Sequence, residues 1–371
     1  MCGLVQSALV RGWEVSYLAL VPSASQGEDW QIPFDFGKDR DRLSEYQICY
    51  SPLQVGKLRR FESGFNQAAA VRLLELEASS PFAENFDAVV AFDSLAVSLL
   101  PKVSALRKLA ILGDPAGKRL WHSSTWSKPA TKLKAALLSF AETSFFGKLP
   151  AEIAIGMFGT EHAKSWQSRM QRPVMDLRPF LPNTAFHAGL SRSDKHILYF
   201  GGTLAGTASK QSIETISTAI MPSLLRRFGE DGVELRIVGD CPNHFREAVQ
   251  RFKSVKIVGR VDLFEAEIAK GDIFILPMNY PVGVRTRICA ALGSGNICIA
   301  HPSVLKNMPE LKSCPSVLFV DTAEDYANCI ADLPSGEDLL SMRKTSRDFF
   351  ESHYLAPVSS AHLLDSLMEK A

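Results

Sequence analysis

Short apolar runs alternate with longer amphipathic segments through the second half of the chain, and this rhythm constrains the fold more than any other feature. Each run is four to six residues long, largely apolar along both faces and rich in β-branched residues. Strands buried on both faces suit a parallel sheet that helices cover on either side. We predict strands at Ile197 to Phe200, Val233 to Val238, Val255 to Val258, Ile273 to Leu276, Ile297 to Ala300 and Val317 to Val320. We predict the covering helices at Lys210 to Phe228, Asn243 to Phe252, Leu263 to Lys270, Arg287 to Ser294 and Ala323 to Leu333. This half is therefore predicted to be a doubly wound, Rossmann-like domain.

The first half repeats the rhythm less regularly, and we expect a second α/β domain there. Its predicted strands are Glu14 to Leu20, Ala88 to Phe92, Leu109 to Leu112 and Ile153 to Met157, and its predicted helices are Asn66 to Ala78 and Thr131 to Phe146. A chain of 371 residues exceeds what one core usually covers, which favours two domains. We place their boundary near Ser191, after a proline-containing connection.

The expected domains are residues 1–190, residues 191–335 and a C-terminal helical part, residues 336–371. The helices of that last part are predicted at Glu337 to Tyr354 and Val358 to Lys370, and we expect them to pack back on the first domain. The chain begins in a predicted helix, Leu4 to Arg11, although a doubly wound domain usually begins with a strand. We therefore expect the first strand of the first domain to be missing.

The charge balance excludes a general positive field for nucleic acid. Lys and Arg total 41 against 40 Asp and Glu, so any anionic ligand must be met by a local site. Seven cysteines stand singly, without the spacing of a metal site, which favours a reducing cytoplasm. Neither a signal peptide nor an apolar run of the roughly 18 residues that a membrane helix needs is evident. We expect a cytoplasmic protein.

The loop after the first strand of the second half has the composition of a phosphate-binding turn. It reads GGTLAGTASK and contains Gly201, Gly202 and, where a helix begins, Lys210. Glycines let the backbone approach an anion, and a lysine supplies a compensating charge. An ordinary flexible turn with a solvated lysine is the alternative interpretation.

The loop after Leu276 carries two arginines at the predicted start of a helix. Gly283 precedes Arg285 and Arg287, and small residues follow them. Cations oppose the positive end of a helix dipole and lose about 0.3 to 1 kcal/mol each there, unless an anion joins them. A diphosphate would reverse this cost, since the guanidinium fork suits phosphate oxygens. The alternative is a pair of exposed surface arginines.

These segments together resemble a known family. GVRTRICAALGSGNICIAH is similar to the donor-site segment of retaining GT-B glycosyltransferases of the family 4 type, the group 1 glycosyl transferases. ILYFGGT, LRIVGDCP and VKIVGRVDLFEAEIAKGDIFILPM follow the family's strands and loops in the same order. The resemblance covers about Lys195 to Leu333 well and the first half thinly. It implies two Rossmann-like domains whose parallel sheets face a central cleft.

Transferred position by position, the resemblance implies a set of donor-site residues. Gly201 and Gly202 would lie near the donor diphosphate, and Lys210 would contact a phosphate. The other implied donor-site residues are Asp240, Gly259, Val261, Gly283, Arg285 and Arg287, of which the glycine and valine of the GRV turn would contact the base. Asp93 and Asp114 end two strands of the first domain and are the catalytic candidates near the transferred sugar. Turn formation or helix capping is the alternative for both aspartates.

The sequence also departs from the family pattern. The family usually carries two glutamates separated by seven residues, where this chain has Val282 and Ala290. Thr203 stands where an arginine commonly follows the loop glycine, and the acceptor-side glycine-rich loop expected before Leu4 is absent. Each lost charged hydrogen bond weakens binding by about 1.5 to 3 kcal/mol, so the donor site is divergent.

The resemblance implies an enzyme that moves a sugar from a nucleoside-diphosphate sugar to a glycan, lipid or small-molecule acceptor. Retention is expected, without a metal ion or other cofactor. A catalytically degenerate protein that binds a nucleotide or glycan, or that partners an active transferase, is the main alternative. A sugar-nucleotide epimerase is the third hypothesis.

The segment Ser127 to Lys148 leaves two structural interpretations open. Four lysines alternate there with leucines and phenylalanines. The segment could lie on an anionic membrane, which would make the protein peripheral at the inner face of the membrane and would suit a lipid-linked acceptor. A helix that turns its apolar face to the core explains the same pattern.

Overall fold

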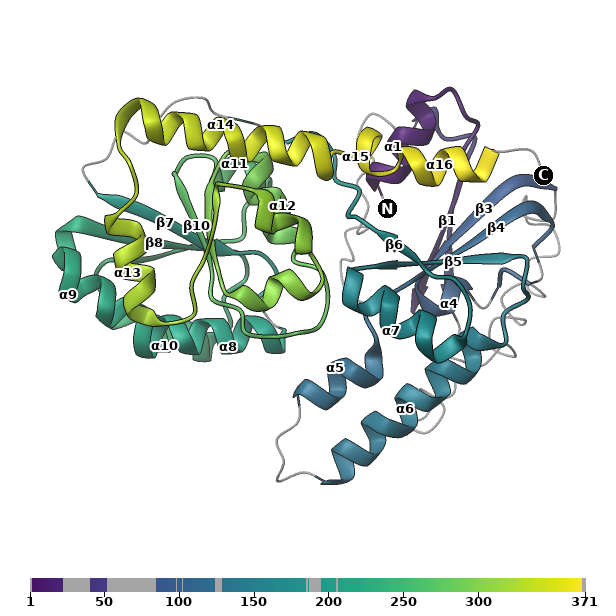
Figure 1. Cartoon of the computed structure of the whole chain (residues 1–371), viewed down its shortest axis with the longest axis horizontal. Helices are drawn as coiled ribbons and strands as arrows, with labels where there is room; N and C mark the ends of the chain where they lie inside the picture. Colours follow the sequence, from purple (N-terminus) through teal and green to yellow (C-terminus); the bar gives the residue numbers. More distant parts are fainter. Residues whose placement is uncertain are drawn as a thin grey trace. The chain divides into compact units, whose positions relative to one another are not determined.

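The computed structural model describes residues 2–22, 41–51, 85–97, 99–101, 103–123, 129–184, 186, 195–204 and 206–368 (Figure 1). The chain forms two compact units. The first contains Met1–Pro182 and Ala356–Ala371, and the second contains Asn183–Leu355. The chain therefore passes from the first unit to the second and returns to the first at its C-terminal end.

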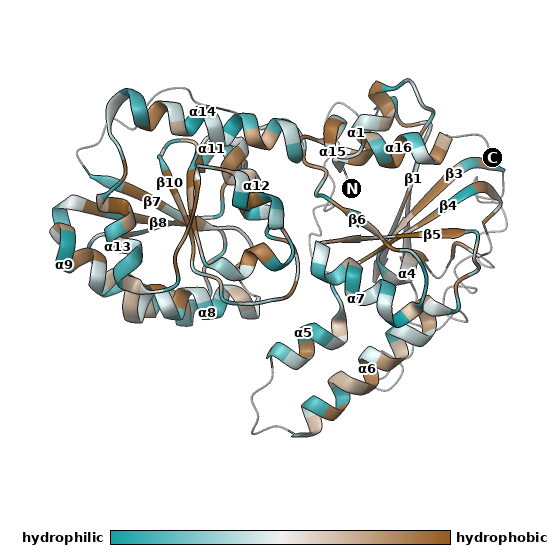
Figure 2. Ribbon diagram, in the orientation of Figure 1, coloured by the Kyte–Doolittle hydropathy of each residue, from teal (hydrophilic) through white to brown (hydrophobic). Residues whose placement is uncertain are grey.

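The second unit is built on a six-stranded parallel sheet with the Rossmann order. Its strands are β7 (His196–Gly201), β8 (Val233–Val238), β9 (Val255–Gly259), β10 (Ile273–Leu276), β11 (Ile297–Ala300) and β12 (Val317–Phe319). They are arranged β12-β11-β10-β7-β8-β9, so chain order reverses between β7 and β10. All four residues of β10 and all four of β11 are buried, and Figure 2 shows hydrophobic residues concentrated in these strands. The doubly wound sheet predicted from the apolar runs is confirmed.

Helices cover both faces of this sheet. They are α8 (Thr207–Thr215), the π-helical segment η4 (Ile216–Ile220), α9 (Met221–Gly232), α10 (Asn243–Gln250), α11 (Phe264–Ile268), α12 (Thr286–Gly293), α13 (Ala323–Ala331) and α14 (Gly336–His353). Two short 3-10 helices, η5 (Pro302–Lys306) and η6 (Pro309–Ser313), follow β11. α14 packs on α12. Its Arg343 is 1% exposed, ion-paired with Asp272 at 2.9 Å, and donates to Gly295 O, just after α12, at 3.0 Å.

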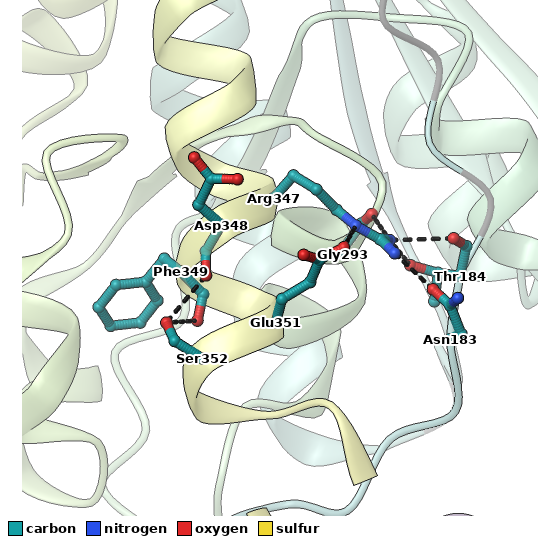
Figure 3. Close-up of polar contacts among 8 residues, drawn as sticks. All are labelled: Asn183, Thr184, Gly293, Arg347, Asp348, Phe349, Glu351 and Ser352. Atoms are coloured by element: carbon teal, nitrogen blue, oxygen red, sulfur yellow. Dashed lines mark hydrogen bonds and ion pairs between the residues drawn. The ribbon is translucent and has the colours of Figure 1, made fainter. Parts of the chain in front are cut away.

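Arg347 of α14 fastens the start of the second unit to the end of α12 (Figure 3). Its Nη1 donates to Gly293 O at 2.6 Å and to the carbonyl and hydroxyl oxygens of Thr184 at 2.9 and 3.0 Å. Its Nη2 donates to Asn183 Oδ1, and its Nε pairs with Glu351 at 2.7 Å. A cation at the C-terminal end of a helix also complements the helix dipole. The position of α12 is thus fixed from its C-terminal end.

The first unit contains a four-stranded parallel sheet, β3-β4-β5-β6, and a separate parallel pair, β1-β2. The strands are β1 (Ser16–Pro22), β2 (Glu45–Ser51), β3 (Phe86–Phe92), β4 (Ala105–Leu112), β5 (Ile153–Phe158) and β6 (Met175–Leu177). Leu109 and Ile111 join one buried cluster, while Ala110 and Leu112 join another. Because successive side chains point to opposite faces, the second half of β4, Leu109–Leu112, is apolar and buried on both sides.

The helices of the first unit provide the two clusters. They are α1 (Cys2–Val10), α4 (Asp93–Val97), α5 (Ala116–Ser123), α6 (Pro129–Gly147), α7 (Thr160–Met170), α15 (Ala356–Ser359) and α16 (Ala361–Met368). One face of the sheet packs on α4, α6 and α7, and the other on α1, α15 and α16. The return of C-terminal helices to the first unit is therefore confirmed for α15 and α16, whereas α14 belongs to the second unit.

The helix expected at Asn66 to Ala78 and the boundary expected at Ser191 both lie outside the described residues. The contact division falls earlier, between Pro182 and Asn183. Among the helices that the structure describes, none combines the length and the apolar character that crossing a membrane requires.

Candidate functional site

The carboxyl end of the second unit's sheet is where its loops and helix N-termini converge. In a doubly wound sheet, ligands bind outside the carboxyl ends of the strands where strand order reverses. Here that point lies between β7 and β10. The loop after β7 begins with Gly202, and the loop after β10 leads to α12 and Arg287. The two segments singled out from the sequence therefore flank one position in the sheet.

Three adjacent strands each have a glycine with a left-handed backbone at their carboxyl end, either as the last residue or directly after it. Gly202, Gly239 and Gly259 have φ of 103°, 117° and 82°. Gly202 N donates to Val238 O at 3.0 Å, and Gly239 N donates to Gly259 O at 2.7 Å. A Cβ on Gly239 would meet Gly202 O at 2.3 Å, so the turns are packed backbone against backbone. Only glycine fits such conformations at this spacing.

Arg287, in the first turn of α12, reaches over the loop that follows β7. Its Nη2 donates to Thr203 O and, at 2.9 Å, to Ser209 Oγ. A Cβ on Gly202 would lie 2.6 Å from its Nε, so the guanidinium rests directly on this glycine. Arg287 is therefore not one of a pair of exposed surface arginines, the alternative interpretation of its segment.

The charge of Arg287 is poorly compensated. Burial lowers its pKa to about 10, because desolvation disfavours the charged form. Its Nη1 is buried without a hydrogen-bond partner in the part of the chain that the structure describes. It lies at the N-terminal turn of α12 and contacts Ser209 of α8, whose N-cap Gly206 offers no capping side chain. Arg287 is thus a half-buried cation with a buried Nη1 at the start of one helix and beside the start of another, an arrangement that favours an anion.

The other two cations expected at this site have different surroundings. Arg285, the N-cap residue of α12, donates to the carbonyl oxygens of Val282, at 2.7 Å, and Tyr280. Its guanidinium carbon lies 5.9 Å from the Tyr280 ring centroid. Arg285 thus holds the shape of its own loop. Lys210 lies in the first turn of α8 with an exposed side chain.

The two positions where the family carries glutamates are apolar and buried. Val282 is 2% exposed and Ala290 is 7% exposed. Gly283, between the first of them and α12, has a φ of 82° and accepts a hydrogen bond from Asn307 at 3.4 Å. These two positions therefore carry no carboxylate.

The remaining second-unit candidates lie along the same carboxyl edge. Gly201 is the last residue of β7 and is buried against Val238 O, which a Cβ would meet at 2.4 Å. Asp240 follows the turn after β8 and is exposed. Gly259 ends β9, and Val261, two residues on, is half-buried. These residues line the loops next to Gly202.

In the first unit, the two catalytic candidates end neighbouring strands. Asp93 follows β3 and begins α4 with a φ of 70°, a left-handed conformation that is uncommon outside glycine. Its Oδ1 would lie 3.1 Å from a Cβ on Gly113, and Asp114 follows directly in the chain after β4. Both aspartates are exposed. A non-glycine residue with a left-handed backbone at a strand end is a functional signal.

Sequence reasoning missed Ser209. This residue is 2% exposed, accepts from Arg287 and donates to Thr203 O at 2.9 Å. It is part of the GGTLAGTASK segment, but nothing in the sequence indicates that α8 turns it toward an arginine far along the chain. Among the described residues, no group of three His, Cys, Asp or Glu side chains is placed to hold a metal ion.

Comparison with known sequences identifies the second unit. Residues 194–335 match the family model described as "Glycosyl transferases group 1". This range contains every strand and loop of the site around Gly202 and Arg287. Sequence comparison finds no curated protein that matches the chain.

Comparison of structures shows the same fold in several glycosyltransferases. A glycosyltransferase from Rickettsia africae superposes with a TM-score of 0.60 at 9% identity, over 96% of this chain and 100% of that one. WaaG, a glycosyltransferase involved in lipopolysaccharide biosynthesis, gives 0.59 at 11% identity, over 99% and 95%. TarM from S. aureus gives 0.58 at 10% identity, over 82% of this chain. This chain spans 59% of the length of that TarM structure.

At such low identity the structural likeness establishes the fold, a pair of Rossmann-like units of the GT-B type. The family model covers the unit that carries the candidate donor site. Residues 194–335 therefore match the model of the group 1 glycosyl transferases, in a chain whose fold is of the GT-B type.

Proposed function

We propose that the chain is a glycosyltransferase that takes a sugar from a nucleoside-diphosphate sugar, with retention of configuration, and passes it to a glycan, lipid-linked or small-molecule acceptor. We further propose that Arg287 binds the diphosphate of the donor. The family of residues 194–335 supports the reaction class. The half-buried side chain of Arg287, with its buried and partnerless Nη1, supports the role of this residue.

A bound diphosphate would compensate the positive charge of Arg287. Its oxygens can accept from Nη1 of Arg287 and from the free N–H groups at the start of α8, which no side chain caps. Binding would also raise the lowered pKa of Arg287, because an adjacent anion favours the charged form. During transfer the leaving diphosphate gains negative charge, and a fixed guanidinium stabilises it without rearrangement.

The neighbouring loops supply further contacts in this proposal. Gly201 and Gly202 let the backbone approach the phosphates, and Lys210 adds a flexible charge at the end of α8 nearest to them. Gly259 and Val261 contact the base. Asp93 and Asp114 serve the transferred sugar or the acceptor, and no metal ion or other cofactor takes part.

A solved structure with the same fold supports the choice of a nucleoside-diphosphate sugar as the donor. The TarM structure is a complex with UDP, a nucleoside diphosphate. Since the present chain has Val282 and Ala290 in place of the usual glutamates, we expect its affinity for nucleotides to be modest. Loss of even one charged hydrogen bond lowers affinity about tenfold or more.

The test compares Arg287→Ala with Arg226→Ala. Arg226 is an exposed arginine of the same unit, 71% exposed and paired with Glu324 at 2.8 Å. Binding of UDP, GDP and ADP is measured by calorimetry, and hydrolysis of the corresponding sugar nucleotides by product analysis. We expect Arg287→Ala to reduce affinity for the preferred nucleotide about tenfold to a hundredfold, and Arg226→Ala to leave it unchanged.

Three results would contradict the proposal. Equal affinity of wild type and Arg287→Ala would remove the diphosphate contact. Nucleotide binding without sugar release from any donor would assign the chain to binding rather than transfer. An isomerised sugar nucleotide formed without acceptor would indicate an epimerase.

A further inference from the structure

Helix α6 of the first unit turns an apolar stripe away from the core. Leu133, Leu137 and Phe140 are 62%, 54% and 75% exposed. They stand four and three residues apart, so they line one face of the helix. Figure 1 shows α6 extending beyond the sheet next to α5, and Figure 2 shows hydrophobic colouring along much of its length. The stripe is a continuous feature rather than a scattered set of exposed residues.

The opposite face of α6 fixes this orientation. Its buried residues are Ala135, Glu142 and Phe146, which are 1%, 4% and 4% exposed. Glu142 accepts hydrogen bonds from the backbone N–H groups of Ala116, at 2.7 Å, and Gly117, at 3.1 Å, at the start of α5. Rotating the helix to bury the leucines would break these bonds. α6 thus turns Phe145 and Phe146 to the core, while Leu133, Leu137 and Phe140 face water.

The charges around the stripe have one sign. The charged residues of α5 and α6 are Lys118, Arg119, Lys132, Lys134 and Glu142. The one carboxylate among them is buried as the cap of α5. The solvent-facing charges of these two helices are therefore basic. Lys118 is ion-paired with Glu161 of α7, which leaves Arg119, Lys132 and Lys134 to complement an anionic surface.

A tryptophan completes the basic and apolar face. Trp121 of α5 is 39% exposed, and Lys132 Nζ lies 4.5 Å from the centroid of its ring and 2.6 Å from its carbonyl oxygen. Tryptophan favours the boundary between water and lipid, and lysines extend from that boundary to the headgroups. Leu106, Leu263 and Val358 are also exposed, but they lie on or beside three different elements.

From this arrangement we propose that the face formed by α5 and α6 docks on a lipid membrane rich in anionic headgroups. Leu133, Leu137 and Phe140 enter the acyl boundary while Lys134 and Arg119 contact headgroup phosphates. A protein partner would need acidic groups around an apolar groove, whereas a membrane offers both features over the whole helix length. The proposal does not depend on the donor site of the second unit.

The test is sedimentation of the full chain with vesicles of phosphatidylcholine, with and without phosphatidylglycerol. Leu133→Gln, Leu137→Gln and Phe140→Gln are combined in one variant, and Leu106→Gln, Leu263→Gln and Val358→Gln in a matched control. We expect anionic vesicles to bind the wild type and the control equally, and the α6 variant about tenfold more weakly. Because these side chains are exposed, circular dichroism and thermal midpoints should match those of the wild type.

A second pair of variants tests the charge. Lys134→Glu should weaken binding to anionic vesicles at least about fivefold, whereas Lys164→Glu, an exposed residue of α7, should change it less than about twofold. Raising NaCl to about 1 M should release the wild type, since the Debye length falls to about 3 Å.

Several outcomes would overturn the proposal. One is equal binding of the wild type and the α6 variant, and another is equal binding to neutral and anionic vesicles. A third is a dimer seen by sedimentation velocity without lipid that the α6 variant abolishes, which would assign the stripe to a second copy of the chain.

Discussion

The guanidinium of Arg287 rests on Gly202, and a Cβ on that glycine would come within 2.6 Å of the arginine Nε. Arg287 lies in the first turn of α12, which follows β10, and Gly202 begins the loop after β7. Chain order reverses between these two strands. The glycine is therefore required both by its left-handed φ of 103° and by the cation that covers it. Backbone and cation form one surface for an anion.

Replacing Gly202 should damage this surface directly. Gly202→Ala imposes a left-handed conformation on alanine and displaces Arg287, and we expect a stability loss of about 1 to 3 kcal/mol with a loss of nucleotide binding. Gly206→Ala in the same loop is the control, because its Cβ would meet nothing within 4 Å. Its cost should stay below about 1 kcal/mol in urea unfolding. Equal effects of the two substitutions would refute the packing argument.

Arg287 should be dispensable for folding. Arg287→Met keeps the volume and removes a charge that burial destabilises, as the lowered pKa shows. We expect the free energy of unfolding without nucleotide to stay within about 1 kcal/mol of the wild type or to rise. The increase in thermal midpoint on adding nucleotide should disappear. A loss above about 2 kcal/mol without nucleotide would instead give Arg287 a structural role.

Arg347, in contrast to Arg287, should contribute strongly to the stability of the fold. Its guanidinium bonds to Gly293, Thr184, Asn183 and Glu351, and its side chain is largely buried (Figure 3). Arg347→Ala removes the donor to the buried Gly293 O and to the partly buried acceptors of Thr184 and Asn183. We therefore expect a loss of about 3 kcal/mol in urea unfolding. Arg226→Ala, at an exposed ion pair, should lose less than about 1 kcal/mol. Similar losses would mean that water replaces the Arg347 bonds.

Glu142 should make stability depend on pH. Burial raises the pKa of its carboxyl group above the ordinary value of 4.5, while hydrogen bonds from Gly117 and Ala116 oppose the rise. Between the two pKa values the folded state holds a proton that the unfolded state has lost. The contribution of this group is therefore greatest below pH 4.5 and declines as pH rises through the raised pKa.

The measurement compares the free energy of unfolding of the wild type and Glu142→Gln across this range. We expect the wild type to lose stability relative to Glu142→Gln as pH rises, because glutamine does not ionise. Glu152→Gln, at an exposed position, is the control and should run parallel to the wild type. A difference that grows in the other direction would show that the backbone hydrogen bonds outweigh burial.

Much of the fold could be predicted because its strands are buried on both faces. The apolar runs at 197–200, 233–238, 273–276 and 297–300 coincide with strands of the second unit. Periodicity also placed the helix observed as α6, Pro129–Gly147. The boundary placed near Ser191 from local composition differs from the division at Asn183, because Thr184 is bonded to Arg347 of the second unit.

The candidate site was only partly predictable. Loop position and glycine content pointed to Gly202 and Arg287, since parallel strands bring their carboxyl ends together. The sequence offered no means of separating Arg287, which contacts Ser209, from Arg285, which bonds to its own loop. That difference depends on side-chain direction in the folded state.

The sequence by itself determined which segments are strands and helices, which loops are rich in glycine, and which family the second half resembles, because these properties depend on local order along the chain. The tertiary structure alone decided which arginine is buried beside Gly202 and which face of α6 meets water. The reason is that desolvation and hydrogen-bond partners arise between residues far apart in sequence, as Glu142 shows by capping α5 and so turning Leu137 outward.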